Sequence, residues 1–152
     1  RAVKFPPRGI RGTAFFRAND YGAGFKDYME CADRETLVMV MCESREAVEN
    51  IEAIVAVDGV DGVFMGPYDL SLSYGIPGRI GDPVMVEARR KVLAACKKAG
   101  KAPGIHELGM TRESVKQVVD EGFLFIALCV DAAFVVRGAN DALKNDRDAA
   151  GL

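Results

Sequence analysis

Tryptophan is missing from this 152-residue chain, and histidine occurs once, at position 106. Long apolar runs are missing too, since none approaches the roughly 20 residues that a membrane-spanning helix needs. The 20 basic and 22 acidic residues give a formal net charge of −2, so no surplus of positive charge is available for nucleic acid or an anionic membrane. We therefore expect neither partner.

The cysteines are few and scattered, and none of them forms a CxxC pair. This spacing excludes a zinc-finger arrangement, and it fits a reducing compartment better than a disulfide framework. No secretory signal peptide is visible at the start of the chain. We therefore predict a cytoplasmic protein with four free thiols, which are Cys31, Cys42, Cys96 and Cys129.

The chain begins at Arg1 rather than at an initiator methionine, and its opening KFPPRGIRG is rich in proline and glycine. Such a stretch is typical of irregular loop. We expect residues 1–152 to form a single domain that is one portion of a longer protein.

Apolar runs alternate with amphipathic segments along the rest of the chain. The runs are continuous rather than alternating, as in strands covered on both faces. Strands are predicted at 36–42, 62–65, 102–105 and 123–129, and helices at 20–31, 44–57, 83–99, 111–121 and 131–146. No two strands are close enough for a hairpin, so the order predicts four parallel βα units. Four units are half of a (β/α)₈ barrel, and an open flavodoxin-like sheet is the alternative.

Two of the predicted strands are followed by an acidic residue, Glu43 after the first and Asp69 shortly after the second. Neighbouring parallel strands lie about 4.8 Å apart, so these carboxylates are expected at one edge of the sheet. A pair of like charges needs a proton or a cation between them, and an oxygen-only pair suits Mg²⁺ or Mn²⁺. Taken singly, Asp69 is also a typical N-cap and Glu43 a typical first residue of a helix.

Between these acids lies the turn Gly66-Pro67, which directly follows the second predicted strand. A glycine there lets a ligand approach the backbone. The amides of Tyr68 and Asp69 would open a short helical turn and point outward, where they can bind a carboxylate. A metal beside such a turn suits a small 2-oxo acid, which chelates the cation through its ketone and carboxylate oxygens.

Several longer stretches resemble one family, the HpcH/HpaI or class II pyruvate aldolases. These are FPPRGIRG, ESREAVENIEAIVAVDGVDGVFMGPYDLSLSYG, AGKAPGI and GFLFIALCVD, which together run through nearly the whole chain. The resemblance implies the second half, strands five to eight, of a (β/α)₈ barrel of the phosphoenolpyruvate/pyruvate type. It implies that Glu43 and Asp69 ligate a divalent metal, Mg²⁺, Mn²⁺ or Co²⁺. It also implies that the turn Gly66 to Asp69, with the amides of Tyr68 and Asp69, holds the pyruvate carboxylate.

The activity implied is reversible, metal-dependent cleavage of a 4-hydroxy-2-oxo acid into pyruvate and an aldehyde, in a homo-oligomer. Related activities remain alternatives: a citrate-lyase-like or malyl-CoA-lyase-like lyase, or a macrophomate-synthase-like enzyme. An inactive remnant that binds metal or only oligomerises is a further alternative. Met41 stands where the family usually has a substrate-contacting glutamine. The family's base and its arginine lie in a half with no counterpart in this chain.

Other residues have a structural interpretation beside a functional one. His106, after the third predicted strand, is a rim residue or a substrate contact. Arg8 and Arg11 in the opening loop are solvated or reach a distal carboxylate of the substrate. The basic stretch ARRKVLAACKK is interpreted as a solvated helix face.

Overall fold

The computed structural model of the chain describes residues 1–150, with side chains described to residue 144. These residues form two compact units, Arg1–Val38 and Met39–Leu152, and each is described by itself. All four cysteines are free, as their spacing predicts. No helix in the described part of the chain is both long and apolar enough to cross a membrane.

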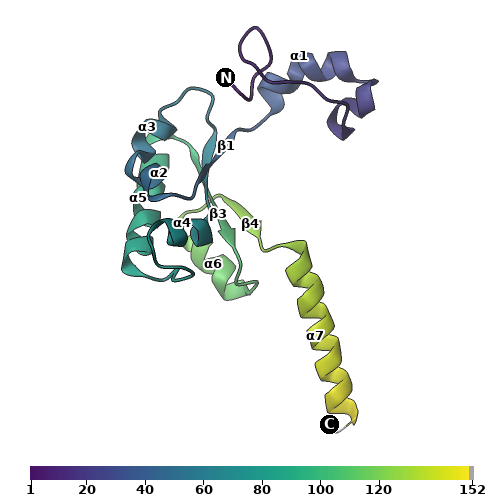
Figure 1. Cartoon of the computed structure of the whole chain (residues 1–152), viewed down its shortest axis with the longest axis vertical. Coiled ribbons are helices and arrows are strands. Elements are labelled where there is room, and N and C mark those ends of the chain that lie inside the picture. Colours follow the sequence, from purple (N-terminus) through teal and green to yellow (C-terminus); the bar gives the residue numbers. More distant parts are fainter. Residues whose placement is uncertain (151–152) are drawn as a thin grey trace. The chain divides into compact units, whose positions relative to one another are not determined.

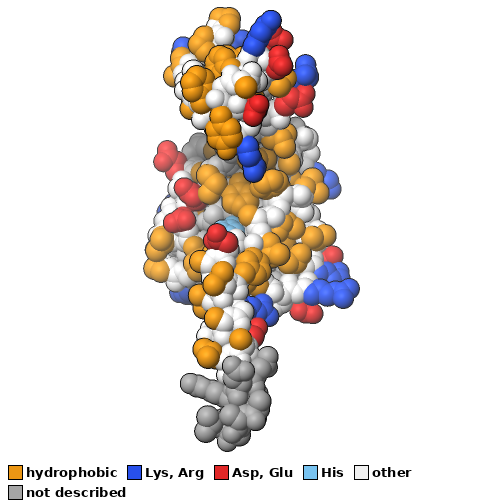
Figure 2. Space-filling model, turned by 90° about the vertical axis from the view of Figure 1, so that its right-hand side faces the viewer, with side chains coloured by type: hydrophobic (Ala, Val, Ile, Leu, Met, Phe, Trp, Pro, Cys, Tyr) orange, Lys and Arg blue, Asp and Glu red, His pale blue; other side chains and the backbone are white. Residues whose placement is uncertain are grey.

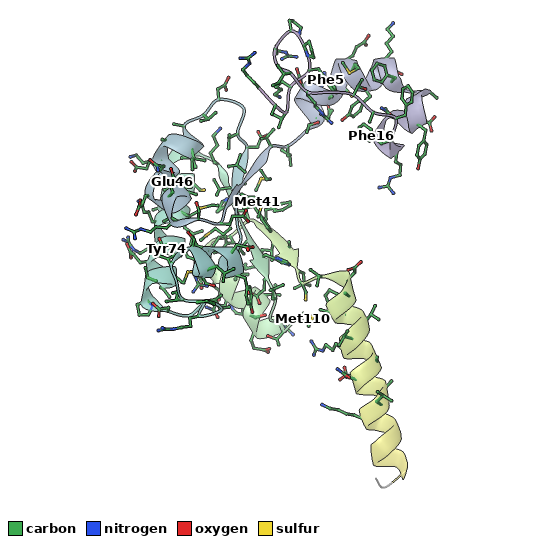
Figure 3. All side chains as sticks on the ribbon, viewed as in Figure 1. Phe5, Phe16, Met41, Glu46, Tyr74 and Met110 are labelled. Atoms are coloured by element: carbon green, nitrogen blue, oxygen red, sulfur yellow. The ribbon has the colours of Figure 1, made fainter. Side chains whose placement is uncertain are left out.

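The first unit is an irregular loop packed on a helix. The loop leads through a 3₁₀ segment, η1 (Arg17–Gly22), to α1 (Phe25–Glu35). Phe5 of the loop is buried, and edge-to-face contacts join Tyr28 of α1 to it and to Phe16 (Figure 3). The predicted helix therefore exists, but it begins later and ends later than the periodicity of the sequence indicated.

The second unit is a four-stranded parallel sheet: β1 (Met39–Cys42), β2 (Gly62–Met65), β3 (Ala102–Glu107) and β4 (Phe125–Leu128). The strands lie in the order β1-β2-β3-β4, so each crossover moves one place in the same direction (Figure 1). A flavodoxin-like sheet would reverse direction at its switch point. The observed strand order therefore agrees with part of a (β/α)₈ barrel, which is the first of the two predicted folds.

The helices of this unit that follow β1, β2 and β3 pack on one face of the sheet (Figure 1). They are α2 (Arg45–Glu49), α3 (Ile51–Val55), α4 (Pro67–Ser73), α5 (Pro83–Ala99) and α6 (Arg112–Glu121). Between sheet and helices lies one core, in which Val63 and Met65 of β2 are completely buried together with Ile51 and Val92. A last helix, α7 (Asp131–Ala150), follows β4.

The helix ends follow the capping residues that the sequence contains. The Asp82 side chain accepts a hydrogen bond from the Val84 amide at the start of α5, and Gly100 ends that helix with φ of +66°. Thr111 caps α6 by accepting from the Ser114 amide at 3.0 Å. These boundaries lie within a residue of those predicted.

The predicted helix 44–57 is divided into α2 and α3 at Asn50. The Asn50 side-chain amide donates to the Glu46 carbonyl at 2.9 Å, and its backbone leaves the helical region (φ −99°, ψ 14°). An asparagine that binds a nearby backbone group competes with the regular helical bonds. The prediction of one continuous helix was therefore wrong at this residue.

The strands also differ from the prediction at their ends. β1 begins at Met39 rather than at residue 36, because α1 extends to Glu35 and a connection follows. β3 continues to Glu107, because its last four residues pair with β4. His106 is thus inside a strand and not after it.

Candidate functional site

Glu43 directly follows β1 at the carboxyl-terminal edge of the sheet. The N-cap of α2 is Ser44, whose side chain accepts from the Ala47 amide at 3.1 Å. Glu43 therefore precedes the helix, and the interpretation as its first residue is wrong. The exposed Glu43 carboxylate is left at the end of the strand, where βα barrels bind their ligands.

Gly66 follows β2 and lies beside Glu43. Its amide donates to the Cys42 carbonyl at 3.3 Å, which extends the β1–β2 ladder by one residue. A Cβ atom at Gly66 would lie 3.2 Å from Oε2 of Glu43. The φ of Gly66 is −98°, which other residues also adopt, so the close approach and not the backbone explains the glycine. The missing side chain therefore lets Glu43 lie directly against the start of α4.

Asp69 lies in the first turn of α4, as its third residue. Gly66 is the N-cap of this helix and Pro67 its first residue, so the interpretation of Asp69 as an N-cap is wrong. The first hydrogen bond of the helix runs from the Leu70 amide to the Gly66 carbonyl at 2.9 Å. The amides of Tyr68 and Asp69 precede that bond, so they belong to the donors that an α-helix leaves without an internal partner.

The side chains of Glu43 and Asp69 are both exposed, and the described part of the chain provides neither carboxylate with an ion pair or hydrogen bond. Among the described residues, no group of three or more His, Cys, Asp or Glu side chains is arranged to hold a metal ion. Two carboxylates are nevertheless enough for Mg²⁺, which keeps several waters and takes further oxygens from its substrate. The two acids therefore suit such an ion by the type of their donor atoms.

Met41 approaches Gly66 from the same side as Glu43. Its side chain is 52% exposed on the face of the sheet opposite the helices (Figure 3), and its Cε atom lies 3.6 Å from the place of a Cβ on Gly66. The wall beside the carboxylate is thus a flexible thioether. It offers no N–H donor to a ligand.

His106 faces this side of the sheet from β3. Nε2 of His106 lies 3.0 Å from the carbonyl oxygen of Cys129, just beyond β4. Its ring centroid is 6.4 Å from that of Phe64, which also packs edge-to-face against Phe125. Figure 2 shows this face of the second unit, with the one histidine in pale blue among orange hydrophobic side chains.

Arg89 belongs to a cavity that the sequence interpretation missed. The cavity, of about 110 Å³, also has Tyr68 and His106 in its wall. Arg89 lies 3.7 Å from Glu121, and its Nε is buried without a hydrogen-bond partner in the described part of the chain. The sequence predicts a solvated helix face for ARRKVLAACKK. This prediction is correct for Arg90, which is exposed, but wrong for Arg89, which is half-buried. Arg89 lies four residues after Met85 and three before Val92, both of which are buried. This helical spacing could have predicted that Arg89 shares their face of α5.

Arg8 and Arg11 are engaged within the first unit. Arg8 pairs with Asp33 at 2.6 Å, and Arg11 donates to the Tyr28 hydroxyl at 2.9 Å. The Arg11 guanidinium also lies 4.7 Å from the centre of the Phe5 ring. Their contacts therefore hold the loop on α1. Arg8 is exposed, as expected of a solvated arginine, whereas Arg11 is half-buried.

Fold and site together define part of a (β/α)₈ barrel with exposed acids at the carboxyl ends of its strands. A family model described as HpcH/HpaI aldolase/citrate lyase matches residues 1–138. The chain belongs to this family, as the resemblance of its motifs implied.

The 4-hydroxy-2-oxo-heptane-1,7-dioate aldolase of Shigella sonnei is 39% identical over 141 residues, which cover 91% of this chain and 53% of that protein. The chain thus spans about half the length of the curated relatives it matches. A crystal structure of a family member from Burkholderia cenocepacia has a TM-score of 0.82 at 35% identity, covering 95% of this chain and 57% of that one. Macrophomate synthase has a TM-score of 0.75 at 22% identity, over 98% of this chain and 53% of its own, which shows a shared fold alone.

Proposed function

We propose that the protein carrying this chain is a divalent-metal-dependent aldolase that reversibly cleaves a 4-hydroxy-2-oxo acid into pyruvate and an aldehyde. The observation that carries the proposal is the close approach of the exposed Glu43 side chain to Gly66 at the turn after β2, where a Cβ atom would lie 3.2 Å from Oε2 of Glu43. The family supports the reaction class, and relatives at 39% identity carry the name of such an aldolase.

Each residue of the site has a definite role in this proposal. Glu43 and Asp69 would hold Mg²⁺, Mn²⁺ or Co²⁺, because their carboxylates are exposed and without basic partners in the described part of the chain. The bound cation supplies a Lewis acid that polarises the 2-oxo group of the substrate. The amides of Tyr68 and Asp69 bind the substrate carboxylate, since the first turn of α4 leaves them unpaired. Gly66 lets Glu43 lie beside this turn, because a Cβ atom there would crowd the carboxylate.

Met41 favours a substrate preference that differs from the one implied by the family resemblance. The thioether replaces an amide donor in the wall of the site, so the contact with the substrate differs from the one implied by the family resemblance. A citrate-lyase-like, malyl-CoA-lyase-like or macrophomate-synthase-like reaction would use the same acids and turn. We also propose that the protein is a cytoplasmic homo-oligomer acting on small molecules, with neither nucleic acid nor a membrane as partner.

The test is release of pyruvate by the full-length protein from a panel of 4-hydroxy-2-oxo acids that includes 4-hydroxy-2-oxo-heptane-1,7-dioate. We expect activity that chelation removes and that Mg²⁺, Mn²⁺ or Co²⁺ restores. Glu43→Gln and Asp69→Asn should each lower kcat/KM more than about a hundredfold, because changing even the outer partners of a metal site costs 10- to 100-fold. The metal-free variants should unfold no more easily than wild type, since each change removes a like-charge repulsion.

Glu46→Gln is the matched control, because Glu46 is an exposed acid on α2 only three residues after Glu43 (Figure 3). It should keep wild-type activity in each metal. Wild-type turnover by the Glu43 or Asp69 variant, or by fully chelated enzyme, would refute the metal assignment. Binding of the cation and of pyruvate without any turnover would instead support the inactive-remnant alternative.

A further inference from the structure

Glu43, Gly66 and His106 lie side by side on three neighbouring strands. In the register of the sheet, Cys42 is level with Met65, and Met65 with Ile105. The residues that follow these three are therefore level with one another as well. Neighbouring parallel strands are about 4.8 Å apart, so the Cα atoms of Glu43 and His106 are separated by about 10 Å with a glycine between them.

All three residues face away from the helices. Side chains alternate along a strand, and His106 has the same orientation as Gly104, over which the Phe64 ring lies. Glu43 and Met41 approach the open side of Gly66. The Glu43 and His106 side chains thus lie on the same face of the sheet, on the two strands that flank Gly66.

The state of the imidazole follows from its hydrogen bond. A carbonyl oxygen only accepts, so Nε2 of His106 carries the proton that it shares with Cys129 at 3.0 Å. The other ring nitrogen, Nδ1, has no hydrogen-bond partner in the described part of the chain, and it is the acceptor of the tautomer that carries its proton on Nε2. The ring is held in place from β4 and keeps an acceptor for a ligand.

We propose that His106 is a specificity residue that accepts, through Nδ1, a hydrogen bond from a hydroxyl group on the aldehyde-derived part of the substrate. This inference rests on the proposed function, in which Glu43 and the turn after Gly66 hold the 2-oxo acid end. In this proposal the carbon chain beyond that end runs towards β3, whose His106 is level with Gly66. The preferred substrates are therefore 4-hydroxy-2-oxo acids that carry a further hydroxyl group.

Binding of two acids that lack the 4-hydroxyl group and are not cleaved tests this proposal without turnover. The Mg²⁺-loaded full-length protein is titrated by calorimetry with 5-hydroxy-2-oxopentanoate and with 2-oxopentanoate. Wild type should bind the hydroxylated acid about three- to tenfold more tightly, the range expected of one net hydrogen bond. Pyruvate addition to glycolaldehyde and to acetaldehyde should show the same preference in kcat/KM.

Two variants separate the substrate contact from the structural one. The His106→Gln side chain keeps a donor where Nε2 reaches Cys129 but has no acceptor at the place of Nδ1, so it should keep the wild-type Tm and lose the preference. The His106→Asn side chain places an acceptor near Nδ1 and should retain most of it. Equal binding of the two acids by wild type, or a preference that survives in His106→Gln, would overturn the proposal. Failure to bind either acid, with or without Mg²⁺, would overturn the proposed function and this inference with it.

Discussion

Val63 and Phe64 are consecutive residues of β2, yet they lie in opposite surroundings. Val63 is completely buried under the helices, as is Met65, whereas Phe64 shares the other face with Met41 and Phe125, which are 52% and 47% exposed. The helix-covered face forms a hydrophobic core whose residues all come from this chain. The open face carries Met41, Glu43 and His106. Stability and chemistry are thus divided between the two faces of one sheet.

The largest effect that tests this contrast is association of the isolated 152-residue polypeptide. In the described part of the chain, β1 pairs only with β2 and β4 only with β3, so each has an open edge beside the apolar open face. Such edges and patches promote association. Sedimentation velocity should show oligomers or aggregates. A cooperative, well-folded monomer at micromolar concentration would contradict the half-barrel interpretation.

A pair of truncations compares the faces directly. Ile51→Ala, at a completely buried position, should lower the free energy of unfolding of the full-length protein by about 2–5 kcal/mol. Met41→Ala should change it by no more than about 0.5 kcal/mol, because the side chain is half exposed at the edge of the site. Urea titrations measure both. Equal losses in the two variants would show that the open face contributes as much to stability as the core.

Alkaline pH should weaken the covered face through its two buried thiols. Burial raises the pKa of Cys42 to about 11, with a smaller contribution from Cys96, and burial raises the pKa of Cys96 to about 11 as well. The thiols ionise in the unfolded chain near pH 9 but stay protonated in the native state. The free energy of unfolding should therefore be unaffected below pH 9 and fall towards pH 11 by up to about 2–3 kcal/mol per thiol.

Urea titrations from pH 8 to 11 follow this loss. The matched control is the double variant Cys42→Ala and Cys96→Ala, whose stability should depend less on pH over the same range. An identical slope in wild type and in the double variant would assign the alkaline loss to other groups.

The smallest effect concerns a single hydrogen bond on the open face. Met41→Gln places an amide where the thioether points towards Gly66 and Glu43. Pyruvate, or its analogue oxalate, should then bind the metal-loaded protein more tightly by about 0.5–1.5 kcal/mol. Met41→Leu is the apolar control and should leave the affinity unchanged. Unchanged oxalate binding in Met41→Gln would mean that the side chain at this position does not contact the ligand.

Prediction from the sequence succeeded where the cause is local. The boundaries of α5 and α6 follow from Asp82, Gly100 and Thr111, each of which acts on its own few residues. Prediction failed where a distant partner or a side chain intervened. Asn50 interrupts a helix of good periodicity, and pairing with β4 extends β3 through His106.

For the site, the sequence placed Glu43 and Asp69 after neighbouring strands, but their single-residue interpretations as helix-start residues were wrong. The structure shows that Ser44 and Gly66 are the caps. The cavity beside Arg89 was missed because arginine on an amphipathic helix is usually exposed, and only the packing of α5 on the sheet distinguishes Arg89 from Arg90.

The sequence by itself determined the alternation of strands and helices, the family and the acids that follow β1 and β2, because hydropathy periods, caps and motifs are properties of short stretches of the chain. Only the tertiary structure decided between barrel and open sheet, since the order of strands is a relation between segments and not a property of any one of them. It also decided that Glu43, Gly66 and His106 stand level with one another. Register depends on backbone hydrogen bonds between strands, and every residue type except proline can make them through both its N–H and its C=O group.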